Sequence, residues 1–109
     1  MNYKVETISV FDKQAKRLAK KYRSLKDELT TLVTSLSKEP MQGTSLGNGF
    51  YKIRISIGSK GKGKSGGARI ITYVKIELET VYLMAMYDKS EMGSIAEKEL
   101  NALFSQIPN

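Results

Sequence analysis

The sequence predicts a single α+β domain in which an antiparallel sheet carries an N-terminal helical hairpin and a C-terminal helix, in the order β-α-α-β-β-β-α. Three observations predict this class. Apolar residues recur at helical spacing in the N-terminal third, alternate at period two in the centre, and return to helical spacing near the end. A chain of 109 residues without internal repeats or a long linker fits one domain, residues 1–109. Strands grouped beside helices favour α+β over alternating α/β folds.

The N-terminal third is expected to form a short strand over residues 5–8 and then two helices. Ser9 and Asp12, and then Ser24 and Asp27, have the spacing of capping boxes, which mark helix starts. Each helix carries one apolar stripe, made by Phe11, Ala15, Leu18, Ala19 and Tyr22 and by Leu25, Leu29, Leu32, Val33 and Leu36. A proline at position 40 and glycines at 43, 47 and 49 indicate that a loop follows.

The centre is expected to form three strands. The first alternates between the apolar Tyr51, Ile53, Ile55 and Ile57 and the polar Lys52, Arg54 and Ser56. The others are expected over residues 68–76 and 80–87, and Ser94 with Glu97 has the spacing of a third capping box before the closing helix. The stripe of that helix is Ala96, Leu100, Leu103, Phe104 and Ile107. We expect the helices to cover one sheet face and the other face to be open, carrying the basic side chains.

The charge distribution indicates a polyanionic partner. The net charge is +7, and residues 50–75 hold seven basic residues and no acid, whereas residues 76–109 hold six acids and two bases. The basic set is Lys52, Arg54, Lys60, Lys62, Lys64, Arg69 and Lys75. The alternative is a merely solvated surface. The chain has no cysteine or histidine, no signal-peptide pattern and no long apolar run, so we expect a cytoplasmic protein without a membrane or metal partner.

Residues 58–65, GSKGKGKS, match the phosphate-binding P-loop pattern G-x-x-x-x-G-K-S. That motif needs a helix after it, because the helix N-terminus helps to hold the phosphates. Here two glycines and a β-branched run follow instead, which predicts a strand. We therefore reject a nucleotide-hydrolysing fold and expect the loop to present its lysines to a polyanion, or to be a solvated hairpin connection.

Three segments carry a family resemblance: KIRI at 52–55, SKGKGKSGGARIITY at 59–73 and YDKSEM at 87–92. Together they resemble the HigB branch of the RelE/ParE toxin superfamily, and the resemblance covers nearly the whole chain, although the two N-terminal helices match only in pattern. It implies a RelE-like fold and a type II toxin–antitoxin toxin that cuts messenger RNA on the ribosome. It also implies a cognate antitoxin, expected to be a small HigA-like protein with a helix-turn-helix.

The resemblance implies site residues as well. The family's strand-borne basic pair falls on Lys52 and Arg54, its next arginine on Arg69, and a basic residue after the last strand on Lys89. The tyrosine that well-known RelE proteins use at the start of the last helix falls on Ile95, so the match fails there. Nearby candidates for the acid–base step are Tyr87 and Glu91, although Glu91 equally fits surface pairing.

Metal-independent RNA cleavage uses the ribose 2′-hydroxyl as nucleophile, and it needs a base, positive charge for the phosphorane and an acid for the leaving oxygen. Arg69 suits the charge role because its fork can hold two phosphate oxygens. In a cluster of bases, neighbouring positive charge lowers a lysine pKa, which makes Lys52 or Lys89 a candidate for proton transfer. Tyr73 and other tyrosines could stack on unpaired bases. No cofactor is expected. The alternatives are a ParE-like inhibitor of DNA gyrase, which generally lacks this basic set, and a non-catalytic RNA-binding module.

Overall fold

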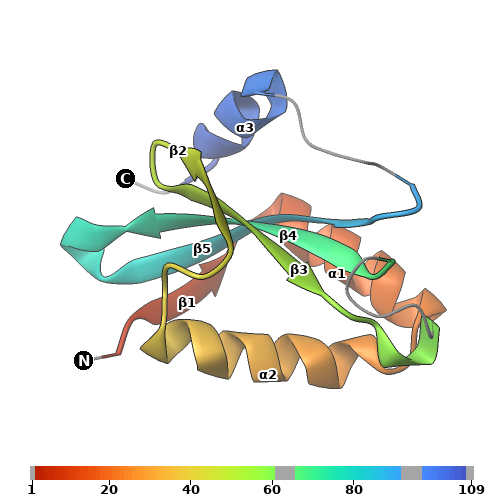
Figure 1. Ribbon diagram of the computed structural model, residues 1–109. Helices are drawn as coiled ribbons and strands as arrows, with labels where there is room; N and C mark the ends of the chain where they lie inside the picture. Colours follow the sequence, from red (N-terminus) through yellow and green to blue (C-terminus); the bar gives the residue numbers. More distant parts are fainter. Residues whose placement is uncertain (1, 61–65, 92–96, 108–109) are drawn as a thin grey trace.

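The structure is a computed structural model that describes residues 2–60, 66–91 and 97–107 (Figure 1). This part of the chain forms β1 (Lys4–Thr7), α1 (Ser9–Lys21), α2 (Leu25–Lys38), β2 (Thr44–Gly47), β3 (Phe50–Ile55), β4 (Ala68–Lys75), β5 (Thr80–Asp88) and α3 (Glu97–Phe104), with short 3-10 helices at Gly58–Lys60 and Ile76–Leu78. The predicted α+β class is confirmed. Within these residues no helix has both the length and the apolar character that crossing a membrane requires.

The strands form one sheet in the order β1-β5-β4-β3-β2. The pairs β2–β3, β3–β4 and β4–β5 are antiparallel, as predicted, but β1 lies parallel to β5. The cause is the helical hairpin, which carries the chain from β1 at one sheet edge to β2 at the other (Figure 1). The sheet is therefore mixed at its β1 edge.

The loop expected between the second helix and the centre contains β2, which the sequence analysis missed. Residues 44–47 lack apolar alternation, and they form a strand because the edge of β3 offers them backbone partners, with Ser45 opposite Tyr51. The turn between β2 and β3 has φ of 54° at Asn48 and 88° at Gly49. A Cβ on Gly49 would lie 2.9 Å from the Tyr73 ring, so glycine allows both the turn and the close approach.

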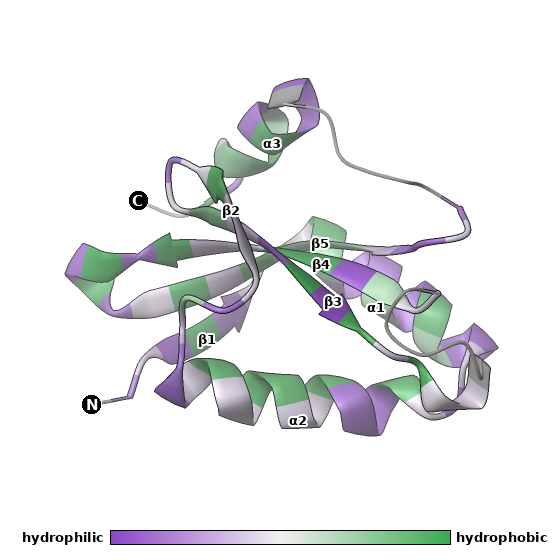
Figure 2. Ribbon diagram, viewed as in Figure 1, coloured by the Kyte–Doolittle hydropathy of each residue, from purple (hydrophilic) through white to green (hydrophobic). Residues whose placement is uncertain are grey.

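Helices α1 and α2 cover one face of the sheet, with their apolar residues turned toward it (Figure 2). The buried side chains of this layer include Phe11, Leu18, Leu25, Leu32, Leu36, Ile53, Ile70 and Met86. Neither predicted capping box forms. Helix α1 begins at Ser9 with Ile8 in the cap position, and the Ser24 hydroxyl bonds to the Glu28 carboxylate at 3.2 Å rather than to a backbone N–H of its helix. The third box, at Ser94, lies outside the described residues.

The opposite face is not open, contrary to our expectation. Helix α3 lies on it, and Phe104 contacts Phe50 and Tyr73 with ring centroids 6.2 and 5.2 Å apart (Figure 1). Leu100 and Leu103 of α3 are buried. The reason is that the apolar stripe of α3 needs a partner surface, and β3 and β4 provide aromatic side chains for it at one end of this face.

Candidate functional site

Three of the predicted site residues form one row across the sheet. Arg54 on β3 lies opposite Arg69 on β4, and Arg69 lies opposite Tyr87 on β5. Directly paired residues of neighbouring strands point to the same face, so the three side chains share one surface. Lys52 is two residues before Arg54 and therefore lies on the same surface. Helix α3 packs on this surface as well, at Phe50 and Tyr73.

The row runs from solvent into the protein. Arg54 is exposed and Lys52 half-buried, whereas Arg69 is 3% and Tyr87 is 4% exposed. Nη1 of Arg69 donates to the carbonyl oxygen of Ala68 at 3.2 Å, which helps to hold the guanidinium against its own strand. The prediction that Arg69 is exposed on an open face is therefore wrong. The prediction that it lies on the same sheet face as Arg54 is confirmed. A buried guanidinium interacts with an anion more strongly than an exposed one, because less water screens it.

The Tyr87 hydroxyl is buried, and no group in the described part of the chain forms a hydrogen bond with it. Burial raises the pKa of Tyr87, and the neighbouring Arg69 charge opposes this rise without cancelling it. The hydroxyl is therefore neutral at physiological pH and has a proton to donate. Buried polar groups without a partner are uncommon in folded proteins and call for an explanation, of which a role in binding or catalysis is one.

The turn after β5 carries the two remaining catalytic candidates. The backbone N–H of Lys89 donates to the Gly67 carbonyl at 3.0 Å, which extends the β4–β5 pairing by one residue and places Lys89 beside Tyr87. The Glu91 carboxylate instead pairs with Arg17 of α1, at 2.9 Å between oxygen and nitrogen. The hydrogen bond from Arg17 lowers the pKa of Glu91. Glu91 thus lies toward α1, on the other side of the sheet from the Arg54–Arg69–Tyr87 row.

Asp88 was assigned no role from the sequence, and the structure gives it a central place in this turn. It is completely buried on the α1 side of the sheet. Its carboxylate accepts hydrogen bonds from the Tyr22 hydroxyl at 2.7 Å and from the backbone N–H and hydroxyl of Ser90 at 2.9 and 2.8 Å. One sequence signal could have found it, because an acid occupies an inward position at the end of an otherwise apolar strand.

The candidates for RNA binding are placed less completely. Lys62, Lys64 and the side chain of Lys60 lie outside the described residues. Tyr73 packs its ring against Phe50 and Phe104, with both centroids 5.2 Å away, and thus contributes to the docking of α3. The chain enters β4 at Ala68, and β4 is antiparallel to β3, so the P-loop pattern lacks the helix that it requires.

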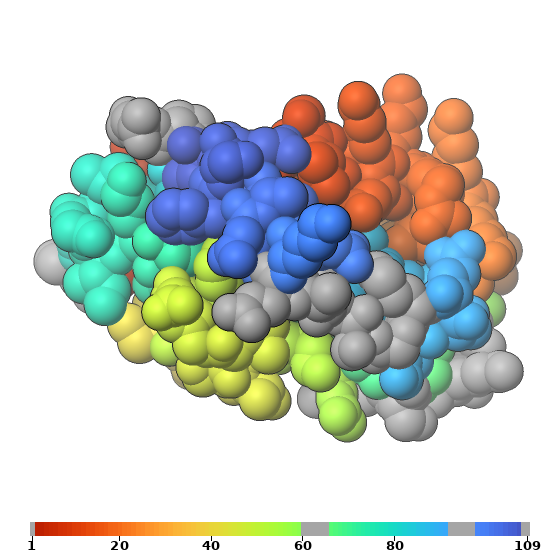
Figure 3. All heavy atoms as spheres, turned by 90° about the horizontal axis from the view of Figure 1, so that it is seen from above, coloured from red at the N-terminus to blue at the C-terminus, as the bar shows by residue number. Residues whose placement is uncertain are grey.

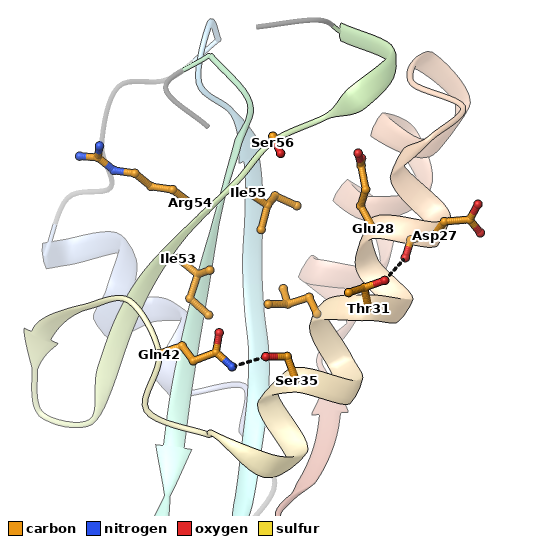
Figure 4. A pocket seen from close by; sticks show the side chains of 10 residues that line it. Asp27, Glu28, Thr31, Ser35, Gln42, Ile53, Arg54, Ile55 and Ser56 are labelled. Carbon is orange, nitrogen blue, oxygen red and sulfur yellow. Dashed lines mark hydrogen bonds between the residues drawn. The ribbon is translucent and has the colours of Figure 1, made fainter. Parts of the chain in front are cut away.

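A groove of about 390 Å³ lies between α2 and β3, and it is separate from the row (Figure 4). Ile53 and Ile55 point into it, whereas the Arg54 side chain extends away from it, to the other face of β3. Across the described residues, His, Cys, Asp and Glu side chains do not gather in groups of three that could hold a metal ion. The row of Arg54, Arg69 and Tyr87 is therefore the candidate site.

A family model described as the RelE toxin of the RelE/RelB toxin–antitoxin system matches residues 8–107. The chain belongs to the RelE toxin family. It is accordingly a toxin of a toxin–antitoxin system, whose partner is an antitoxin.

Several solved toxin structures have the same fold. A mutant of the Escherichia coli toxin RelE in the free state has a TM-score of 0.61 and 16% identity, over 97% of this chain and 94% of that one. A chain of the toxin–antitoxin complex RelBE2 from Mycobacterium tuberculosis has a TM-score of 0.59 and 18% identity, over 81% and 92%. A metal-bound toxin from Helicobacter pylori has a TM-score of 0.53 and 22% identity, over 84% and 99%. At these identities the likeness shows the fold alone.

Proposed function

We propose that this RelE-family toxin is a metal-independent endoribonuclease of the HigB-like branch that cuts messenger RNA on the ribosome in the cytoplasm. One observation carries the proposal: the Arg54–Arg69–Tyr87 row, in which two arginines are directly paired on neighbouring strands, next to a tyrosine with a buried hydroxyl. Like charges at directly opposite positions destabilise a sheet. A phosphate bound at the row would interact with both positive charges, and the Tyr87 hydroxyl could donate its proton to the leaving oxygen.

The reaction requires no group beyond the RNA and these side chains. The ribose 2′-oxygen attacks the adjacent phosphorus and loses its proton, the bond from phosphorus to the 5′-oxygen breaks, and that oxygen gains a proton. The products are a 2′,3′-cyclic phosphate and a 5′-hydroxyl. The guanidinium groups stabilise the charge that develops on the phosphorane. Tyr87 is assigned the general acid because its raised pKa keeps it protonated, and Lys89 beside it is assigned the transfer of the 2′-hydroxyl proton. Glu91, paired with Arg17, is left out of this set.

Burial increases from Arg54 to Arg69 and Tyr87, and this difference sets the order in which the three residues meet the RNA. Arg54 is exposed and meets an incoming phosphate without rearrangement, whereas Arg69 and Tyr87 are reached only when the side chains over them give way. Arg54 therefore contributes to association as well as to chemistry, while Arg69 and Tyr87 act mainly in the chemical step.

Primer extension on messenger RNA after induction of the toxin tests the proposal. Growth arrest should coincide with cuts inside coding regions, and purified ribosome complexes should yield 2′,3′-cyclic or 3′-phosphate ends even when free divalent ions are chelated and ribosome integrity is verified. A 3′-hydroxyl product contradicts the mechanism. Intact messenger RNA with trapped DNA breaks indicates a gyrase inhibitor instead, and arrested translation with intact messenger RNA indicates a non-catalytic RNA-binding protein.

The antitoxin is proposed to be a small HigA-like protein with a helix-turn-helix, encoded next to the toxin. Coexpression of that neighbour should yield a stable complex and restore growth. A neighbour that neither binds the toxin nor restores growth contradicts this assignment.

A further inference from the structure

We infer that Tyr22 and Asp88 are positioning residues, which hold the turn after β5 and thereby fix Lys89 and Tyr87 relative to Arg69. The inference rests on the proposed function, because it names residues that act on the proposed site from the opposite side of the sheet.

Both the side-chain carboxylate and the backbone carbonyl of Asp88 accept hydrogen bonds within the turn at residues 88–91. The Asp88 carboxylate accepts from the backbone N–H of Ser90 at 2.9 Å, and the Asp88 carbonyl accepts from the N–H of Glu91 at 2.9 Å. These bonds fix the backbone on both sides of Lys89, whose own N–H is bound to Gly67 at 3.0 Å. The backbone conformation of Lys89 is thus fixed by its own N–H bond and by the bonds of the residues on either side of it.

Helix α1 anchors this turn through Tyr22. The Tyr22 hydroxyl donates to Asp88 Oδ2 at 2.7 Å, while the Tyr22 backbone N–H donates to Leu18 at 2.8 Å at the end of α1. The anchor is buried at Asp88 and joins residues 66 positions apart in the sequence. The link between the helix and the turn is therefore short, and it is shielded from water at its Asp88 end. The Arg17–Glu91 pair connects the same two elements, but its side chains are 55% and 41% exposed, so it restrains the turn much less.

Successive side chains of β5 point to opposite faces of the sheet, so a backbone held at Asp88 also fixes the residues beside it on the other face. Asp88 points toward α1, whereas Tyr87 belongs to the row and Lys89 follows beside it. A buried carboxylate is costly to place in a core, and an apolar residue would pack there at lower cost. Its presence is explained if the position of the turn matters more than core stability, because a catalytic group displaced by about 1 Å can lose on the order of 10² in rate.

The test uses Tyr22→Phe, which removes the hydroxyl and keeps the ring, with Arg17→Gln as a matched control on the same turn. Amide hydrogen exchange measured by NMR should accelerate at Ser90 and Glu91 in Tyr22→Phe and much less in Arg17→Gln. Single-turnover cleavage on saturating ribosomes should fall roughly 10-fold in Tyr22→Phe, within the loss that misplacement can cause. In Arg17→Gln it should stay within about twofold, because exposed ion pairs contribute little.

A double-mutant cycle separates positioning from general destabilisation. In a Lys89→Ala background, Tyr22→Phe should have a clearly smaller effect on cleavage, because one of the two groups that it positions is gone. In a Lys52→Ala background it should keep its full effect, because Lys52 lies on β3. Equal effects in both backgrounds, or unchanged exchange at Ser90 and Glu91, overturn the inference. If the wild-type toxin cleaves no RNA, the proposed function fails, and the exchange data still decide whether Tyr22 holds the turn.

Discussion

Arg69 combines a permanent charge with an exposed fraction of 3%, a combination that is rare for arginine. Removing a charge from water carries an effective penalty of several kcal/mol, so the protein has to be stable enough to hold it there. A guanidinium already fixed in a shielded position needs little reorganisation when charge develops on a phosphate. This is the property that electrostatic stabilisation of a transition state requires.

Arg69→Ala should therefore reduce single-turnover cleavage on saturating ribosomes by about 10²–10³, the loss of one preorganised donor. Ribosome binding should change little. Arg69→Lys keeps the charge but loses the fork, and it should be nearly as impaired. Arg23→Ala, at an exposed arginine between α1 and α2, is the control and should cleave normally. Full activity of a folded Arg69→Ala variant would remove Arg69 from the mechanism and leave the loop lysines as the better candidates.

Tyr87→Phe should change the free energy of unfolding and the cleavage rate in opposite directions. The buried hydroxyl has no hydrogen-bond partner among the described residues, and such a group costs about 1–3 kcal/mol. Its removal should raise the free energy of unfolding by about 1 kcal/mol and lower the cleavage rate by at least about 10². Thr72→Val is the matched control: Thr72 Oγ1 is also buried without a partner, but Thr72 lies opposite Leu83, outside the row. It should raise stability without changing cleavage.

The raised pKa of Tyr87 also sets the sign of a pH effect. The unfolded chain ionises this tyrosine near pH 10, whereas the folded protein retains the proton to higher pH. Its contribution to the free energy of unfolding is therefore unchanged below about pH 10 and becomes destabilising above it. Denaturation measured from pH 8 to 11 should show a smaller alkaline loss of stability in Tyr87→Phe. An identical loss in both proteins contradicts the assignment of a raised pKa.

At the scale of elements, the sequence predicted the periodic segments well and the non-local contacts poorly. Alternation along two strands was sufficient to place Arg54 and Arg69 on one face. The burial of Arg69 depends on packing from other parts of the chain, which alternation along its own strand does not reveal. The pairing of Glu91 with Arg17 joins residues 74 positions apart, and β2 exists only because the edge of β3 accepts it. None of these contacts leaves a local pattern in the sequence.

At Ser24, hydrogen bonds to residues distant in the sequence replace the predicted capping box. The Ser24 hydroxyl lies 2.9 Å from the Ser59 hydroxyl, and Glu28 accepts from the Gly58 N–H at 2.7 Å. Both bonds attach the start of α2 to the segment that leads from β3 into the lysine-rich run. Ser24, which was predicted to cap the helix, thus anchors this segment together with Glu28.

Glu28→Ala should therefore loosen the segment after β3 rather than unfold α2. Because Glu28 is only half-buried, we expect a loss of about 1 kcal/mol in the free energy of unfolding, and faster amide exchange at Gly58 and Ser59. Asp27→Ala, on the neighbouring exposed position of α2, is the control and should leave both amides unchanged. Protected amides at Gly58 and Ser59 in Glu28→Ala would show that the anchor contributes nothing.

On the scale of the whole molecule, the positive charge and the chemical site lie on different parts of the chain. The row of Arg54, Arg69 and Tyr87 runs from the surface into the protein. It lies on the sheet face that also carries α3, and Figure 3 shows the molecule from that side. Helix α1 and the lysine-rich run instead carry a large excess of positive charge, whereas the acids and bases of α2 balance. Attraction to the ribosome and cleavage of the RNA should thus respond to different substitutions.

Replacing Lys60, Lys62 and Lys64 together with glutamine tests this separation. Each phosphate contact releases counterions, so losing three contacts should reduce the slope of log affinity against log salt by about 2 and weaken ribosome association at low salt. The control replaces Lys13, Lys20 and Lys38, exposed on α1 and α2, which removes the same charge from another part of the surface. The slope of log affinity against log salt should change much less in this control.

Once complexes are preformed at saturating concentration, both triple variants should cleave at nearly the wild-type rate, because the row is intact. Equal salt slopes in the two variants would mean that net charge, and not the loop, drives association, while a lost chemical step in the loop variant would place these lysines in the catalytic site.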